Sequence, residues 1–208
     1  MSLIGAAPRT ACLLLLATVA GPVGSTTAQP AAEPPLEMAI RVFDGETEVT
    51  DQSVVDLHAA GTRNAPIPGR RTGDGVLFGV QPGSYDAQAI LERDGRVVAV
   101  RWAERLTAVH YPDEAGRHLE VVNFQGPYGA LQVRRPTDPW TARVVWEAMA
   151  FRAGDRSLAV ANAVAGSGYA VLALPAGSYD IAFRDAGTVR WFEGVEVIRG
   201  LTSVLRVE

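Results

Sequence analysis

The sequence predicts an all-β protein built from two tandem β-sandwiches. Short runs of alternating apolar and polar residues recur along the 208-residue chain and are separated by Gly, Pro and Asp, a pattern typical of sandwiches and barrels. No apolar pattern with helical spacing continues beyond one or two turns. The residues Gly-Ser-Tyr-Asp occur at positions 83–86 and again at 177–180, which indicates that one unit is duplicated.

The first predicted strand lies within residues 38–43. It places Met38, Ile40 and Val42 on the same side, which predicts a strand with one apolar face. Residues 61–75 are expected to form a long loop. The run 76–80 is apolar enough to be a central strand, and residues 85–92 and 96–106 are expected to form a hairpin around Asp94-Gly95. The other strands predicted for this set are 53–58 and 118–124.

The second predicted set repeats this plan. Each Gly-Ser-Tyr-Asp segment follows an apolar strand and precedes an alternating strand, a turn with Arg, Asp and Gly, and a strand with Trp102 or Trp191. The segment 125–127, Gln-Gly-Pro, is a natural boundary, so we expect one sandwich at 36–124 and the other at 125–208. The strands predicted for this second set are 130–134, 142–151, 157–164, 169–174, 179–184, 188–197 and 202–207.

The first 28 residues have the layout of a secretory signal peptide. Arg9 precedes the apolar run 11–20, and small or hydroxylated residues follow up to Ala28. Gly21 and Pro22 interrupt the run too early for a membrane span. We therefore expect cleavage near Ala28, a Pro- and Ala-rich leader at 29–35, and a mature chain in the periplasm or outside the cell with no membrane span.

The composition excludes several chemistries. Cys12, the only cysteine, lies inside the predicted signal peptide, so the mature chain cannot form disulfides and must rely on apolar cores. All 19 basic residues are arginine, which excludes chemistry that needs lysine. The net charge is −4 and no basic stripe is present, so nucleic acid is not an expected partner.

Residues 174–180 and 191–197 carry a resemblance to a known family. They read Leu-Pro-Ala-Gly-Ser-Tyr-Asp and Trp-Phe-Glu-Gly-Val-Glu-Val, and Gly200 follows. These segments resemble the Ig-like sandwiches known as prealbumin-like or carboxypeptidase-regulatory-like repeats, which occur in exported bacterial proteins, often beside von Willebrand factor A-type domains. The resemblance extends over 168–208 and, less closely, over 75–105. It implies an accessory or interaction module, because its motifs are structural.

Exposed aromatic residues could form a binding surface. Tyr179 is expected to point into the core and to bond nearby backbone through its hydroxyl. Alternate residues of a strand point to the same side, which groups Trp102, Trp146 and Trp191 with apolar residues of their strands. These three tryptophans are therefore also expected to belong to the core. Trp140, between Pro139 and Thr141 in a predicted loop, is the one candidate ligand contact.

Two acidic clusters contain residue types that can bind metal ions, but neither has the spacing of a known metal motif. The simplest interpretation of both is a solvated acidic hairpin, so we expect no metal and no cofactor, although calcium binding by the acidic loops stays open. His58 is expected to be a surface or hydrogen-bonded strand residue. The two clusters are His110, Asp113, Glu114 and His118, and Asp44, Glu46, Glu48 and Asp51.

No catalytic motif is found in the sequence. It contains no His-Glu-x-x-His, no Gly-x-Ser-x-Gly and no phosphate-binding glycine loop. The residues shared by the two copies look fold-forming, without a common polar cluster. We therefore predict a non-enzymatic exported protein that offers loops or a free strand edge to a protein partner. The alternatives are a carbohydrate-binding module that uses Trp140, and a hydrolase built on residues 110–118.

Overall fold

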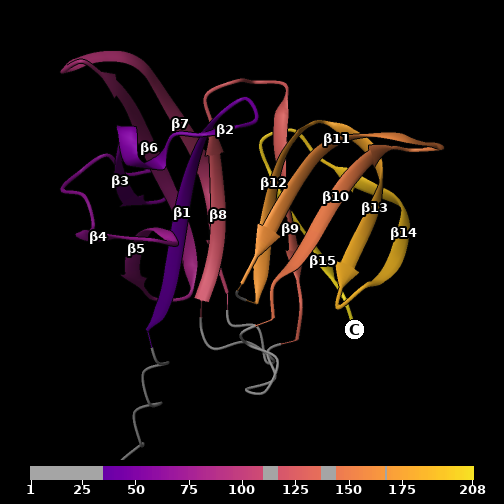
Figure 1. Cartoon of the computed structure of the whole chain (residues 1–208). Helices are drawn as coiled ribbons and strands as arrows, with labels where there is room; N and C mark the ends of the chain where they lie inside the picture. The colour runs from indigo at the N-terminus through magenta and orange to yellow at the C-terminus, as the bar shows by residue number, and fades with distance from the viewer. Residues whose placement is uncertain (1–34, 110–116, 137–143, 167) are drawn as a thin grey trace, which may run out of the picture. The chain divides into compact units, whose positions relative to one another are not determined.

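The computed structural model describes residues 35–109, 117–136, 144–166 and 168–208. Their regular structure is β throughout, apart from a short 3-10 turn at Thr50–Gln52 (Figure 1). Among these residues, no helix is long and apolar enough to span a membrane. The prediction of an all-β protein is therefore confirmed.

The first half of the described chain forms two sheets, which we name A and B. In sheet A, the inner strand β1 pairs with β5, and β4 forms an edge next to β5. In sheet B, β6 lies between β3 and β7. The strands of sheet A are β1 (Leu36–Asp44), β2 (Thr47–Glu48), β4 (Gly69–Thr72), β5 (Gly75–Val80) and β8 (Arg117–Asn123), and those of sheet B are β3 (Ser53–Ala59), β6 (Gly83–Arg93) and β7 (Arg96–Ala108).

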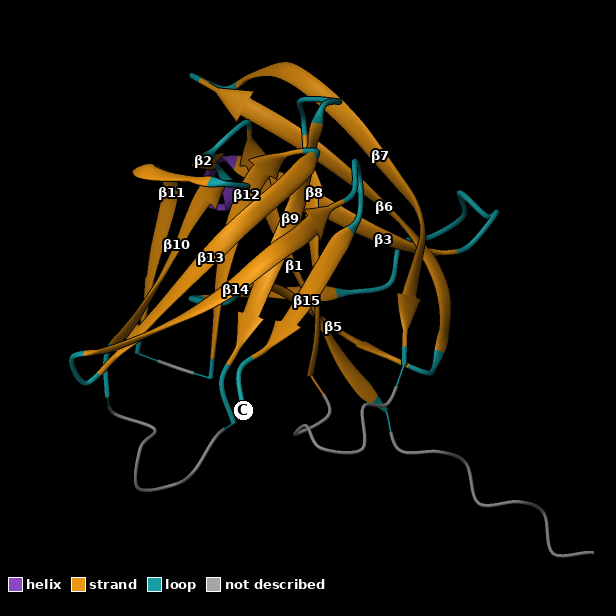
Figure 2. Ribbon diagram, turned by 90° about the vertical axis from the view of Figure 1, so that its right-hand side faces the viewer, coloured by secondary structure: helices purple, strands orange, loops and turns teal. Residues whose placement is uncertain are grey.

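The second half forms sheets C and D. In sheet C, β9 lies between β12 and β15, and in sheet D the strand order is β11-β10-β13-β14 (Figure 2). The strands of sheet C are β9 (Tyr128–Arg134), β12 (Tyr169–Pro175) and β15 (Thr202–Arg206), and those of sheet D are β10 (Trp146–Arg152), β11 (Asp155–Ala165), β13 (Gly177–Asp185) and β14 (Thr188–Val197).

One pairing scheme occurs in both halves. The first strand of each half pairs antiparallel with the strand before Gly-Ser-Tyr-Asp, as β1 with β5 and β9 with β12. It pairs in parallel with the last strand of its half, β8 or β15. The remaining strands make the second sheet, in the orders β3-β6-β7 and β10-β13-β14. The halves differ in the connecting strand, because β4 joins sheet A whereas β11 joins sheet D.

Each pair of sheets encloses an apolar core, because alternate side chains of every strand point to the same side. The core between sheets A and B includes Ile40, Leu57 and Phe78, all buried. The core between sheets C and D includes Leu131, Trp146 and Phe183, also buried. Each half is therefore a β-sandwich.

A third apolar cluster joins sheet A to sheet C. It consists of the buried residues Ala39, Phe43, Leu77, Leu119 and Val121 of sheet A and Ala130, Val171 and Ala173 of sheet C. Sheet A is thus covered on both faces, and residues 33–208 form one compact unit. The prediction of a single apolar face for the first strand was wrong, because its second face is buried against sheet C rather than exposed to water.

Most predicted strands are present, with small differences at their ends. The hairpin at Asp94-Gly95 is confirmed, and both residues have positive φ angles, as a two-residue turn of this kind requires. Residues 61–75, predicted as a loop, contain β4. Because β4 pairs with its outer edge, β5 is an inner strand of sheet A, as predicted. Part of the predicted strand 142–151 lies outside the described residues, and β10 begins at Trp146.

Candidate functional site

The first Gly-Ser-Tyr-Asp segment ends in an aspartate that ties separate pieces of backbone together. One carboxylate oxygen of Asp86, on β6, accepts a hydrogen bond at 2.8 Å from the backbone N–H of Arg105 on β7. The other oxygen accepts one at 2.8 Å from the N–H of Gly61, in the turn after β3. These bonds lower the pKa of Asp86, with the Arg105 N–H as the larger cause. The carboxylate therefore fixes two neighbouring strands.

The second segment repeats this arrangement. Asp180, on β13, accepts hydrogen bonds from the N–H of Gly194 at 3.2 Å and from the N–H of Gly154 at 3.3 Å. The Arg156 guanidinium adds a further bond at 3.2 Å. The pKa of Asp180 is lowered as well, chiefly by the Gly194 N–H.

A β-bulge at the same place in both sandwiches explains why an aspartate is needed. The β6–β7 register shifts just after Tyr85, and the β13–β14 register shifts just after Tyr179. The bulged residues, Arg105 and Gly194, have φ angles of 59° and 65°. A bulge takes one residue out of the ladder, and the aspartate oxygen accepts the N–H of that residue. Aspartate at this position is therefore a structural requirement of the bulge.

The Tyr before each aspartate is a core residue, as predicted for Tyr179. The Tyr179 hydroxyl donates a hydrogen bond to the carbonyl of Pro175 at 2.7 Å, and the Tyr85 hydroxyl donates one to the carbonyl of Gln81 at 2.6 Å. Both rings lie in the cores, and burial raises the pKa of Tyr179. These tyrosines hold the turns before their strands.

An arginine lies over a tryptophan beside each aspartate. The guanidinium of Arg63 is 4.4 Å from the centre of the Trp102 ring, and that of Arg156 is 4.3 Å from the centre of the Trp191 ring. Each arginine also pairs with the glutamate two residues after its tryptophan, Glu104 or Glu193.

A second ring packs against each of these tryptophans from the neighbouring part of the sandwich. His58 lies 5.6 Å from Trp102, and Phe151 lies 5.2 Å from Trp191, measured between ring centres. The indoles are therefore bracketed by an arginine and a ring. A sugar could not stack on an indole face while the guanidinium covers it.

The prediction of core tryptophans was right for one residue and wrong for two. Trp146 is 2% exposed and packs on Phe183, as predicted. Trp191 is 38% exposed, and Trp102 is only partly buried.

Trp102 shares the face of Val98 and Val100, and Trp191 shares that of Val189, but this face of β7 and β14 points away from the core. Val195 and Val197, which were also predicted to share the face of Trp191, contact the core instead, because the bulge shifts the register between Trp191 and these valines. Trp140, the predicted ligand contact, lies outside the described residues and stays a prediction.

An aspartate, an arginine, a tryptophan and a glutamate therefore form the same polar cluster in both sandwiches. This corrects the expectation that no polar cluster is common to the two copies. The arginines were missed because Arg63 lies in a loop after β3 whereas Arg156 lies on β11, so their positions in the sequence do not align. The repeated Trp-x-Glu of residues 102–104 and 191–193 is the signal that could have found them.

His118 and several of the acids of the two predicted clusters have partners within the protein, and so does His58. His118 Nε2 lies 2.7 Å from Glu120 Oε1, whereas residues 110–116 lie outside the described residues. His58 is buried, with Nδ1 2.9 Å from the Asn64 carbonyl oxygen. Asp44 and Glu48 pair with arginines. Within the described ranges, no group of three or more His, Cys, Asp or Glu could hold a metal ion.

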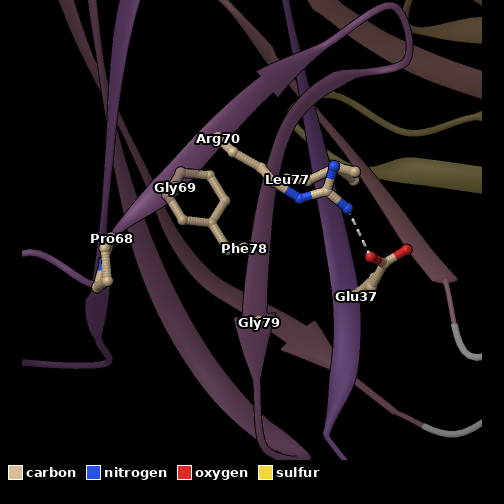
Figure 3. Close-up of a pocket in the computed structure, with 7 residues that line it drawn as sticks. All are labelled: Glu37, Pro68, Gly69, Arg70, Leu77, Phe78 and Gly79. Atoms are coloured by element: carbon tan, nitrogen blue, oxygen red, sulfur yellow. Dashed lines mark hydrogen bonds and ion pairs between the residues drawn. The ribbon is translucent and has the colours of Figure 1, made fainter.

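A small cavity of about 350 Å³ lies beside β4 and β5 (Figure 3). Its charged lining is an ion pair between Arg70 and Glu37, 2.9 Å apart. The Phe78 ring lies so close to Gly69 that an added Cβ would be 2.5 Å from it. The two charges compensate each other and the rest of the lining is largely apolar, so the cavity has no reactive centre.

The outer face of sheet B carries an apolar row across its three strands. Val54, Ile90 and Val100 are cross-strand neighbours on β3, β6 and β7. Val54 is 42% exposed and Val100 is 52% exposed, with Ile90 partly buried between them. Val98, two residues from Val100, is also 52% exposed. We call Val54, Ile90, Val98 and Val100 the sheet B patch.

The second sandwich has charged residues at the matching positions. His58 lies opposite Asp86, and Phe151 lies opposite Asp180, so His58 and Phe151 occupy the same position in the two sandwiches. The residues four positions before them, Val54 and Glu147, therefore also match. Counting forward from each aspartate in the same way matches Ile90 with Arg184.

Glu147 and Arg184 form an ion pair of 3.1 Å on the outer face of sheet D. Val189 lies opposite Arg184 on the next strand, so it occupies the position in sheet D that Val100 occupies in sheet B. The fold therefore accepts charge at these positions, and the sheet B patch is not a requirement of the sandwich.

Paired sheets around apolar cores thus define an all-β protein of the sandwich class. No family model matches the chain, and no curated protein matches it. Among solved structures, it aligns with the Bacillus anthracis TIE protein at 16% identity and a TM-score of 0.30, over 83% of this chain but only 34% of that one. This chain therefore spans about a third of that protein.

Two structures from Bacteroides ovatus also align with the chain. A candidate cell adhesion protein matches at 12% identity and a TM-score of 0.30, over 83% of this chain and 91% of that one. A candidate adhesin matches at 11% identity and a TM-score of 0.28, over 79% and 83%. At such TM-scores these likenesses carry no argument about function.

Proposed function

We propose that this protein is exported and works as a non-enzymatic β-sandwich module that binds a protein partner. In this proposal, residues 1–28 are a signal peptide and 29–35 a leader, and the mature chain acts in the periplasm or outside the cell. Residues 36–124 and 125–208 are two copies of a prealbumin-like, Ig-like sandwich. The recurring pairing scheme and the paired aspartate clusters support the duplication.

The observation that carries the binding role is the sheet B patch. A contiguous exposed apolar patch with a polar rim is typical of a protein interface. Covering a valine or isoleucine that is half exposed gains on the order of 1 kcal/mol, since full burial is worth about 1.5–3 kcal/mol. Because the matched positions of sheet D hold an ion pair, folding alone does not account for the apolar side chains of sheet B.

The chemistry of this face favours a protein over other ligands. A row of three side chains across three strands offers a broad contact, which suits another protein surface. A carbohydrate would need an open indole face, and the nearest indole, Trp102, lies under Arg63. Nucleic acid would need a basic surface, whereas the chain has a net charge of −4.

Site-specific photo-crosslinking tests this function. A photoreactive residue at Val100, in the protein expressed and exported in its own host, should yield a protein adduct of defined mass. The same residue at Val189, the match of Val100 in sheet D, is the control and should not. Adduct formation should disappear in the double variant Val54→Glu/Ile90→Arg. No adduct at Val100, or equal adducts at both positions, would overturn the proposal.

A further inference from the structure

We propose that the partner covering the sheet B patch is a second copy of this chain. This inference rests on the proposed function, because it names the protein that binds there. The two copies pack sheet B against sheet B about a two-fold axis that lies along the row Val54, Ile90 and Val100. Each of these side chains then meets its own counterpart, as in an isologous interface.

The charges at the two ends of the patch support this choice of partner. Toward the hairpin turn, the exposed charged residues without an ion-pair partner within sheets A and B are two acids and one base. In the opposite direction, beyond the row, they are two bases, because the other two exposed charges at that end, Arg63 and Glu104, pair with each other. The two groups are Glu92, Asp94 and Arg96 at the turn, and Arg101 and Arg105 at the opposite end.

A two-fold axis along the row reverses the strand direction between the copies. The end with a net negative charge then faces the end with a net positive charge, twice in the same dimer. Complementary charges of this kind select a partner and fix its register. Arg93, which is also near the turn, is already paired with Asp44 at 3.2 Å and is not counted.

The chain already uses this mode of contact within itself. Sheet A packs on sheet C through apolar side chains such as Ala39, Leu77 and Val171. Sheets A and C are covered on both sides, and within the described part of the chain nothing covers the outer faces of sheets B and D. The face of sheet D holds the Glu147–Arg184 ion pair, so sheet B is the face suited to a further sheet-on-sheet contact.

The oligomeric state of the exported, processed chain tests this inference. Sedimentation equilibrium should give the mass of a dimer. Val54→Glu/Ile90→Arg, which copies the ion pair that sheet D accommodates, should raise the dimer dissociation constant by about 100-fold or more. The control Leu158→Glu/Val164→Arg alters apolar residues on β11 that are more exposed than Val54 and Ile90, and it should leave the dimer unchanged.

Disulfide trapping gives a second measurement that does not depend on how the charged variant folds. The processed chain is expected to contain no cysteine, so Val100→Cys would be its only thiol. Mild oxidation should link two copies of this variant and should leave Val189→Cys unlinked.

The outcomes separate this inference from the proposed function. A wild-type chain that stays monomeric at about 100 μM while Val100 crosslinks to a different protein overturns the dimer but keeps the binding role. A dimer that survives Val54→Glu/Ile90→Arg, or that is lost in the β11 control, overturns the assignment to sheet B. A wild-type sequence background that gives neither the dimer nor the Val100 adduct overturns both proposals.

Discussion

Asp86 accepts the backbone N–H of Arg105 across the β6–β7 pair, at a point where the ladder is interrupted by a bulge. Arg105 has a positive φ of 59°, whereas glycine fills the matching position of the second sandwich, as Gly194. In each sandwich an aspartate therefore holds the same bulge. The bulged residue suits this backbone conformation in the second sandwich, where it is Gly194, and is strained by it in the first, where it is Arg105.

Replacing Arg105 by glycine should stabilise the protein. Non-glycine residues in the left-handed region carry a cost of about 1 kcal/mol or more, and the bond to Asp86 uses only the backbone N–H of residue 105. We expect Arg105→Gly to raise the free energy of unfolding by about 0.5–1 kcal/mol in urea denaturation. The reciprocal Gly194→Arg should lower it. Changes of the same sign in both variants would contradict this account.

Asp86→Asn should destabilise the first sandwich. An amide keeps one acceptor oxygen but loses the second, so one of the N–H groups of Gly61 and Arg105 is left without its partner. A lost bond of this kind costs about 1–2 kcal/mol. The measurement is the midpoint of urea unfolding, with Glu46→Gln, in the exposed turn between β1 and β2 of the same sandwich, as the control. A variant that unfolds at the wild-type midpoint would show that the bulge does not need the carboxylate.

The stability of the protein should fall in acid because of the same two aspartates. The pKa of each is lowered in the folded state, so the unfolded chain binds the protons more readily. Their contribution is complete above the ordinary Asp pKa of about 3.9 and is lost as the pH falls through the lower folded-state values.

The free energy of unfolding should therefore decrease between about pH 4 and about pH 2, an interval that begins at the ordinary Asp pKa of about 3.9 and extends below it. The double variant Asp86→Asn/Asp180→Asn should show a flatter pH dependence, measured by urea unfolding at both ends of this interval. An unchanged slope would mean that other carboxylates govern the acid response.

Removing Arg156 should expose the face of Trp191. The guanidinium lies 4.3 Å from the ring centre, so Arg156→Ala should make the tryptophan fluorescence more sensitive to acrylamide. Arg199→Ala, at an exposed arginine after β14, is the matched control and should leave quenching as in the wild type. Equal quenching in the two variants would place the guanidinium away from the indole.

The strands could be predicted because alternation along a strand depends on neighbouring residues alone. Which face of a strand is covered depends on a distant partner, and here the sequence pattern was insufficient. Trp191 shares a face with Val189, as its parity predicts, yet that face is the outer one of sheet D. Ala39 and Phe43 are buried because sheet C covers them, and no local pattern indicates that contact.

The candidate interface could not be predicted from the sequence for a related reason. Val54, Ile90 and Val100 are far apart in the chain and become neighbours only through the pairing of three strands. The comparison that distinguishes them, with Glu147 and Arg184, requires both sandwiches to be superimposed through their aspartates. Trp140, predicted from its loop context, stays a prediction.

The burial of sheet A on both faces has a consequence for folding cooperativity. If the first sandwich unfolded alone, Ala130, Val171 and Ala173 of sheet C would lose their apolar cover, and Phe43 and Leu77 would lose theirs if the second unfolded. Partial unfolding of either sandwich thus carries a penalty in the other, which favours a single all-or-none transition. A chain truncated to one sandwich would then inherit an exposed apolar sheet, and aggregation would be its characteristic failure.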